Sequence, residues 1–131
     1  MEINKSLLDN LLKQAAESPR LRMNYDLRTS SEDNSQRMLN ALLPGTVLPI
    51  HRHTKTTETM VVLCGRMEEI FYEKNPLRET SRILLEAGGE VQGLCIPVGQ
   101  WHTVNVLEPT VILECKDGKY EPLGKEDMIE G

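Results

Sequence analysis

Short apolar runs separated by turn residues fill almost the whole chain after residue 20, and they constrain its fold more than any other feature. Eight such runs, spaced about every ten residues, are rich in Val, Ile, Leu and Met: QRMLNALL, TVLPIHRH, TMVVLCG, RMEEIFY, SRILLEA, GLCIPVG, WHTVNVL and TVILECK. Turn signals such as Pro44-Gly45 and Gly88-Gly89 lie between them. This spacing is typical of an all-β sandwich or barrel and not of alternating strands and helices. We therefore predict an all-β domain over residues 20–131.

The first 19 residues follow a different pattern. Their apolar residues recur at helical spacing, at Leu7, Leu8, Leu11, Leu12 and Ala15. This predicts an amphipathic helix over residues 4–17, with Ser6 as its N-cap and Ser18-Pro19 as its end. We expect residues 1–19 to form an N-terminal helix that packs across the outside of the domain of residues 20–131.

Composition limits the classes of partner and compartment. The 131 residues suit one domain, and a net charge of −5 argues against a nucleic-acid partner, which would need a basic face. No run approaches the roughly 18 apolar residues of a membrane span, and the polar first residues do not resemble a signal peptide. An odd count of cysteines without a CxxC pair (Cys64, Cys95 and Cys115) favours free thiols in a reducing compartment. We expect a cytoplasmic protein.

The segment HRHTKTTE, residues 51–58, contains two of the three histidines of the chain. On a strand, His51 and His53 point to the same face, and Glu58 follows after a short turn. The third histidine, His102, follows a turn in PVGQWHTV. Neutral imidazole and carboxylate are metal ligands, but histidines on strands also occur at the rim of a barrel without a metal. Spacing alone leaves both readings open.

A resemblance to a known family favours the metal site. Gly45, His51, His53, Glu58 and Gly65 match the spacing of the first motif of the cupin superfamily, and Pro97-x-Gly99-x-x-His102 resembles the core of the second. The resemblance implies a cupin fold, which is a small double-stranded β-helix or jelly-roll barrel. It also implies one divalent metal bound by His51, His53, Glu58 and His102, with coordination positions left for a ligand.

The second motif departs from the family pattern at two positions. Val91 stands where the motif has a glycine, and Val106 stands where it often has an asparagine, with Asn105 one residue earlier. Both departures concern the shape of the loop and leave the histidine ligand in place.

The chain also resembles the WbuC-type cupin-fold metalloproteins of bacterial surface-polysaccharide gene clusters. The similarity rests on QRMLNALLPGTVLPIHRHTKTTET, IPVGQWHTV and ECKDGKYEP and extends from about residue 20 to residue 128. It implies a role in surface-polysaccharide or sugar metabolism with Fe, Mn, Ni, Co or Zn as the metal. The reaction stays open between sugar isomerisation or epimerisation, dioxygenation by Fe(II), and ligand sensing without catalysis.

Three polar residues are candidates for contacts with a small-molecule substrate: Arg37, Asn40 and Lys55. Arg37 could clamp an anion if it points inward, or form a salt bridge if it points outward. Lys55 lies between the expected ligands and could contact a phosphate or carboxylate, or lie in solvent. Glu114 or Tyr120 could supply a general acid or base.

Three further expectations follow from strand parity and edges. Cys64 shares parity with Glu58 along TMVVLCG and should point into the barrel, whereas Trp101 should face away from the site. Small cupins often pair as dimers through edge strands, so the resemblance also implies a homodimer.

Overall fold

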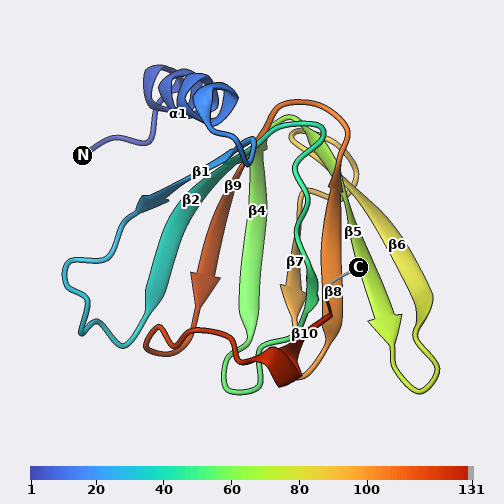
Figure 1. The fold of residues 1–131 in the computed structure, drawn as a ribbon. Coiled ribbons are helices and arrows are strands. Elements are labelled where there is room, and N and C mark those ends of the chain that lie inside the picture. Colours follow the sequence, from blue (N-terminus) through green and yellow to red (C-terminus); the bar gives the residue numbers. More distant parts are fainter. Residues whose placement is uncertain (130–131) are drawn as a thin grey trace.

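Two antiparallel sheets of five strands face each other, and a helix lies across the outside of one of them (Figure 1). The computed structural model describes residues 1–129. The predicted all-β architecture with an N-terminal helix is confirmed. No helix in this part of the chain is long and apolar enough to cross a membrane.

The two sheets contain all eight predicted runs and two further strands. In spatial order, the first sheet consists of β1 (Arg22–Asp26), β2 (Gln36–Leu42), β9 (Thr110–Lys116), β4 (Glu58–Cys64) and β7 (Gly93–Ile96). The second consists of β10 (Met128–Ile129), β3 (Ile50–His51), β8 (Trp101–Val106), β5 (Arg66–Glu73) and β6 (Arg78–Glu86). A short 3₁₀ helix, η1 (Lys125–Asp127), precedes β10.

The interior between the sheets has an apolar part and a polar part. The apolar core consists of Leu42, Met60, Val62, Met67, Leu85, Ile96, Val106 and Ile112. Because side chains alternate along a strand, polar residues two or four positions away share the same inner face. Glu58 precedes Met60 on β4 in this way, Glu69 follows Met67 on β5, and His102 precedes Val106 on β8. Each of the strands β4, β5 and β8 therefore contributes an apolar residue to the core and a buried polar residue elsewhere along the same inner face.

Helix α1 (Lys5–Glu17) covers the outer face of the first sheet. Leu11 and Ala15 are buried against Leu39 and Ala41 of β2 and against Val111 of β9. The helix begins one residue later than predicted, and Asn4, not Ser6, is its N-cap. The side chain of Asn4 accepts a hydrogen bond of 2.9 Å from the backbone N–H of Leu7, so Ser6 lies within the first turn.

A bulge near the end of β4 corrects the expectation for Cys64. The pairing of β4 with β9 shifts in register between Val62 and Cys64, so the inward parity of Glu58 does not extend to Cys64. Cys64 packs against the cluster beneath α1. Gly65 follows with a φ of +90°, and a Cβ at this position would lie 2.2 Å from the carbonyl oxygen of Pro109, so only glycine fits.

Candidate metal centre

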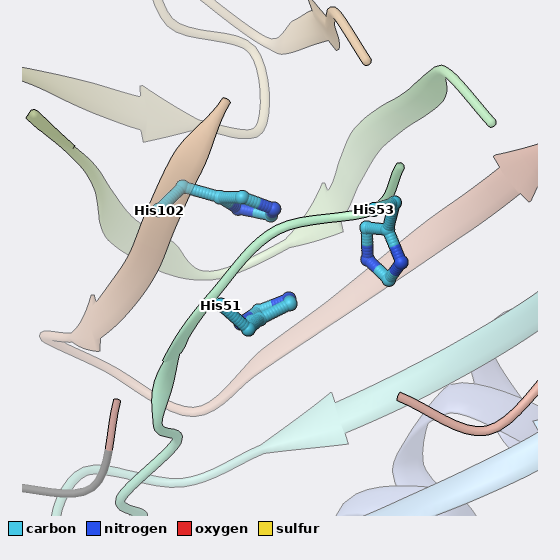
Figure 2. A group of neighbouring side chains, drawn as sticks. All are labelled: His51, His53 and His102. Carbon is cyan, nitrogen blue, oxygen red and sulfur yellow. The ribbon is translucent and has the colours of Figure 1, made fainter. Parts of the chain in front are cut away.

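Three histidines from two neighbouring segments lie together in the interior (Figure 2). His51 ends β3, His53 follows it, and His102 lies on β8. Their ligand nitrogens all lie within 4.8 Å of one another. The ring centroids of His51 and His102 are 4.3 Å apart, and the centroid of His53 is 5.1 Å from the first and 5.9 Å from the second. All histidines of the chain therefore meet at one place.

The pairing of β3 with β8 places His51 directly opposite His102. Because β3 has only two residues, its own pairing is too short to hold this register. Contacts on both sides of the strand support it. The backbone N–H of Gly99 donates to the carbonyl oxygen of His53 at 2.8 Å, from a φ of +83° that favours glycine. Next to His102, the Thr103 hydroxyl donates to the carbonyl oxygen of Leu48 at 2.9 Å. The two sequence motifs are thus joined by direct hydrogen bonds.

The C-terminal segment supports β3 from its other side. Met128 of β10 pairs with His51, and the backbone N–H of Arg52 donates to the carbonyl oxygen of Asp127 at 3.0 Å. The guanidinium of Arg52 also donates to the carboxylate of Asp127 at 2.9 Å. The strand that carries His51 therefore lies between β8 and the end of the described chain.

Hydrogen bonds at one ring nitrogen leave the other nitrogen of two histidines available. Nδ1 of His51 lies 3.0 Å from the carbonyl oxygen of Pro49 and must be protonated to donate to it. Nδ1 of His102 lies 2.7 Å from Oε1 of the buried Glu69. Within residues 1–129, Nε2 of His102 is buried and has no hydrogen-bond partner. Buried nitrogens without a partner are costly, and a cation within reach of all three rings would satisfy them.

Glu58 adjoins the histidines without belonging to the group of three. Its side chain is buried, and Oε1 lies 3.3 Å from Nε2 of His53 and 3.9 Å from Nζ of Lys116. Neither contact has hydrogen-bond geometry, so this oxygen has no hydrogen-bond partner among the described residues. The carboxylate therefore has an oxygen without a hydrogen-bond partner at the edge of the histidine cluster, where this oxygen could coordinate a cation.

Burial keeps the three histidines neutral. Desolvation, and then repulsion from the His102 ring, lowers the pKa of His51 to about 4. Burial also lowers the pKa of His53 and that of His102. Neutral imidazole is the form that binds a metal, so the cluster is in its binding state at neutral pH.

Two further carboxyl groups in the interior have raised pKa values. Burial, followed by repulsion from Glu58, raises the pKa of Glu114 to about 7. The Asn40 amide donates to Oε2 of Glu114. Burial and the neighbouring Glu114 hold the pKa of Glu69 well above its usual range. Glu114 can therefore accept or release a proton near neutral pH.

A cavity of about 390 Å³, called the inner cavity below, adjoins the histidines between the two sheets. It is lined by polar groups at His51, His102, Glu58, Glu69, Glu114, Asn24, Asn40, Arg20, Arg22 and Tyr120, and by apolar side chains that include Met60 and Ile112. A second cavity of about 570 Å³, called the outer cavity below, lies beside it. This cavity is lined by His53 and by the segment before β10. Tyr120 and Leu123 line both cavities and so lie between them.

The structure separates the three residues proposed to contact substrate. Asn40 lines the inner cavity. Arg37 shares the outer face of β2 with Leu39 and Ala41 and forms an ion pair with Asp33, which is the outward, salt-bridged alternative. It does not line either cavity.

Lys55 and the two candidate acid–base residues lie at different depths. Lys55 is exposed and pairs with Glu121 at 2.8 Å on the rim of the outer cavity. Glu114 lines the inner cavity, and Tyr120 lies between the two. Trp101 faces away from the histidines, as expected, with its ring beneath Arg52 and Lys74.

The sequence reasoning missed Glu69 and the pair Arg20 and Arg22. Glu69 had a usable signal, because in RMEEIFY it shares the face of Met67 and Phe71, and a carboxyl group on an apolar face needs a partner. The arginines had none, since they precede and begin β1, a polar strand that resembles a mixed-charge loop.

Comparisons with known proteins identify the fold. A family model described as "Domain of unknown function (DUF6016)" matches residues 3–84, and no curated protein matches the sequence. Among solved structures, an oxalate oxidase in complex with the substrate analogue glycolate has a TM-score of 0.62 at 17% identity, covering 79% of this chain and 54% of its own. The capsular polysaccharide assembling protein CapF from Staphylococcus aureus has a TM-score of 0.64 at 21% identity, covering 86% of this chain and 32% of its own.

KdgF from Halomonas sp. has a TM-score of 0.58 at 17% identity, covering 76% of this chain and 82% of its own. These neighbours are cupin-fold proteins, so the predicted cupin fold is confirmed. The chain spans about half of the oxalate oxidase and about a third of CapF.

The raised pKa of Glu114 predicts a pH-dependent effect of Glu114→Gln on the metal-free protein. The folded state binds the Glu114 proton more tightly than the unfolded state does, so this stabilisation is present below pH 4.5 and is lost as pH rises through 7. Unfolding in urea should show the variant about 2–3 kcal/mol more stable than wild type at pH 8 and nearly equal below pH 4.5. Glu90→Gln, at an exposed site, should follow wild type at every pH. A constant offset between Glu114→Gln and wild type would contradict this account.

Proposed function

The chain belongs to the family of domains of unknown function DUF6016, and from this premise we propose that it is a metal-binding cupin. One divalent metal is held by His51, His53 and His102, with Glu58 as the fourth ligand. The observation that carries the proposal is the buried Nε2 of His102, which has no partner within residues 1–129 although two other imidazoles lie within reach of the same point.

The donor set limits the choice of metal. Imidazole nitrogens with one carboxylate suit Fe(II), Mn(II), Ni(II), Co(II) and Zn(II). When bound, such an ion polarises a carbonyl or hydroxyl oxygen of a small molecule, or in the case of iron supports chemistry with O₂. Glu69 has a positioning role, because its buried carboxyl group lies 2.7 Å from Nδ1 of His102 and so holds that ring by the nitrogen that does not bind the metal.

We propose that the ligand is a small molecule of sugar or surface-polysaccharide metabolism. The likeness in sequence to WbuC-type cupins supports this, and one structural neighbour is named a capsular polysaccharide assembling protein. Glu114, with a pKa of about 7, lines the same cavity as His51 and His102 and can transfer a proton during isomerisation or epimerisation. Asn40 holds the Glu114 carboxyl group in place.

A dioxygenase that uses Fe(II) is the second candidate, and a ligand sensor without catalysis is the third. One structural neighbour is named an oxalate oxidase, which supports testing O₂ chemistry. Turnover assays on the metal-loaded protein with nucleotide sugars, with O₂ consumption measured in parallel, separate the three. Sugar conversion without O₂ uptake supports the isomerase, O₂ uptake supports the dioxygenase, and ligand binding without either supports the sensor.

We further propose one cupin unit of residues 20–131 with the helix of residues 1–19 docked on it, a cytoplasmic location and a homodimer. Pairing with a second copy would use an outer strand of a sheet, such as β6, whose side chains are mostly exposed.

Metal analysis of the purified protein tests the site itself. Protein purified without chelator should contain about one divalent metal per chain, and the double variant His51→Ala/His102→Ala should contain almost none, because it removes two of three imidazoles. Cys95→Ser, which removes an exposed thiol that could bind metal adventitiously, should keep its metal. Equal metal content in the double variant and wild type, measured by mass spectrometry of the elements, would refute the assignment.

Glu69→Gln tests the positioning role with a matched neighbour. The amide fills the same space but alters the hydrogen bond to Nδ1 of His102, so metal affinity should fall about 10–100-fold. Glu68→Gln changes the preceding residue of β5, which faces outward and pairs with Arg82, and should alter affinity less than twofold. Competition with a chromophoric chelator measures both, and equal affinities would show that Glu69 is only a filler.

A further inference from the structure

Arg20 and Arg22 stand apart from every other arginine of the chain. The remaining six each form an ion pair with an acidic side chain: Arg28, Arg37, Arg52, Arg66, Arg78 and Arg82. Within residues 1–129, no carboxylate lies within 4.0 Å of the guanidinium of Arg20 or Arg22. Both of these arginines line the inner cavity that also contains the histidines.

Arg22 points into the molecule from the edge of the first sheet. It lies opposite Leu42, a residue of the apolar core, in the pairing of β1 with β2. Its side chain is half-buried, and Nη1 donates to the carbonyl oxygen of Val47 at 2.9 Å, which leaves further N–H groups of the guanidinium unused. Burial and the nearby Arg20 lower the pKa of Arg22, as expected for two like charges without a counter-ion.

The backbone between the two arginines is held in an unusual conformation. Leu21 has a φ of +57°, which is unfavourable for a leucine. Backbone hydrogen bonds on both sides hold it there: the N–H of Leu21 donates to Ser18, and its carbonyl oxygen accepts from the N–H of Leu43, each at 3.0 Å. The hydroxyl of Thr46 also donates to the carbonyl oxygen of Arg20 at 2.7 Å. The placement of both arginines is thus built into the turn after α1.

We propose that Arg20 and Arg22 form the anion-binding end of the cavity and recognise a carboxylate or phosphate group of the ligand. A guanidinium donates two parallel hydrogen bonds to either group, and the negative charge would offset the repulsion between the arginines. In a chain of net charge −5, such a pair kept free of acidic partners indicates a function.

The charges along the cavity set the orientation of this ligand. The carboxyl groups of Glu58, Glu69 and Glu114 line the cavity beside the histidines, whereas Arg20 and Arg22 are the arginine or lysine side chains that line it. The lining also includes the apolar side chains of Leu48, Val104 and Ile112. The ligand class is therefore a small organic acid or phosphate ester whose acidic group lies at the arginines, whose middle is largely apolar, and whose far end meets the histidines. The part of this inference that concerns the histidines rests on the proposed metal site.

Isothermal titration calorimetry with inorganic phosphate and with glutarate tests the anion site on metal-free and metal-loaded protein. Wild type should bind at least one probe at millimolar concentration, and Arg20→Gln/Arg22→Gln should bind it about tenfold more weakly or worse. Arg78→Gln/Arg82→Gln, which removes the same two charges from exposed ion pairs of β6, should stay within twofold. The side chain of Arg20 makes no hydrogen bond within residues 1–129, so Arg20→Gln alone should leave the fold intact. This single variant should also weaken binding of the probe.

The outcomes separate the anion site from the metal site. Binding of phosphate alone identifies a phosphate ester as the ligand class, and binding of glutarate alone identifies a carboxylate. Binding that is equal in wild type and the arginine variants, or absent in wild type, overturns the inference. If the protein takes up no metal while binding of the probe still depends on the arginines, the proposed metal site fails and the anion site stands.

Discussion

The cross-strand pair of His51 and His102 is the contact on which the rest of the site depends. It joins two residues that are 51 positions apart in the chain, through a strand of only two residues. A pair of this length does not hold its own register, so the structure supports it by backbone bonds from Gly99 to His53 and by the ion pair of Arg52 with Asp127. A slip of one residue would turn His51 away from the interior and abolish the cluster.

The interior combines an apolar core with a group of buried polar residues that the protein alone does not fully satisfy. Glu58, Glu69 and His102 each have a buried polar atom without a hydrogen-bond partner in the described residues. Such atoms destabilise the fold by an amount that a bound cation would offset. We therefore expect binding at this site to stabilise the protein, and we interpret the polar interior as a feature selected for ligand binding and not for packing.

Much of this arrangement was predictable from the sequence, because apolar runs between turn residues indicate strands and family motifs mark the site residues. The runs predicted eight strands, and the resemblance to the cupin motifs, not spacing alone, implied that His51, His53 and His102 act together. The bulge before Cys64 was not predictable, since an extra residue in one strand leaves no mark in the hydrophobic pattern. Strands β1 and β10 escaped notice because one is polar and the other has two residues. The face of Arg37 was left open, and only the packing of Leu39 and Ala41 under α1 decides it.

X-ray absorption spectroscopy of the metal-loaded protein tests the central claim most directly, because it identifies the atoms bound to the ion. The account predicts scattering from three imidazole rings together with oxygen ligands, and no sulfur. Cys64 packs beneath α1, Cys95 is exposed, and Cys115 lies opposite Arg37 on the outer face of the first sheet. It also predicts that the oxygen ligands, but not the imidazoles, change when a small-molecule ligand is added. A sulfur ligand, or fewer than three imidazoles, would contradict the assignment of His51, His53 and His102 as one metal centre.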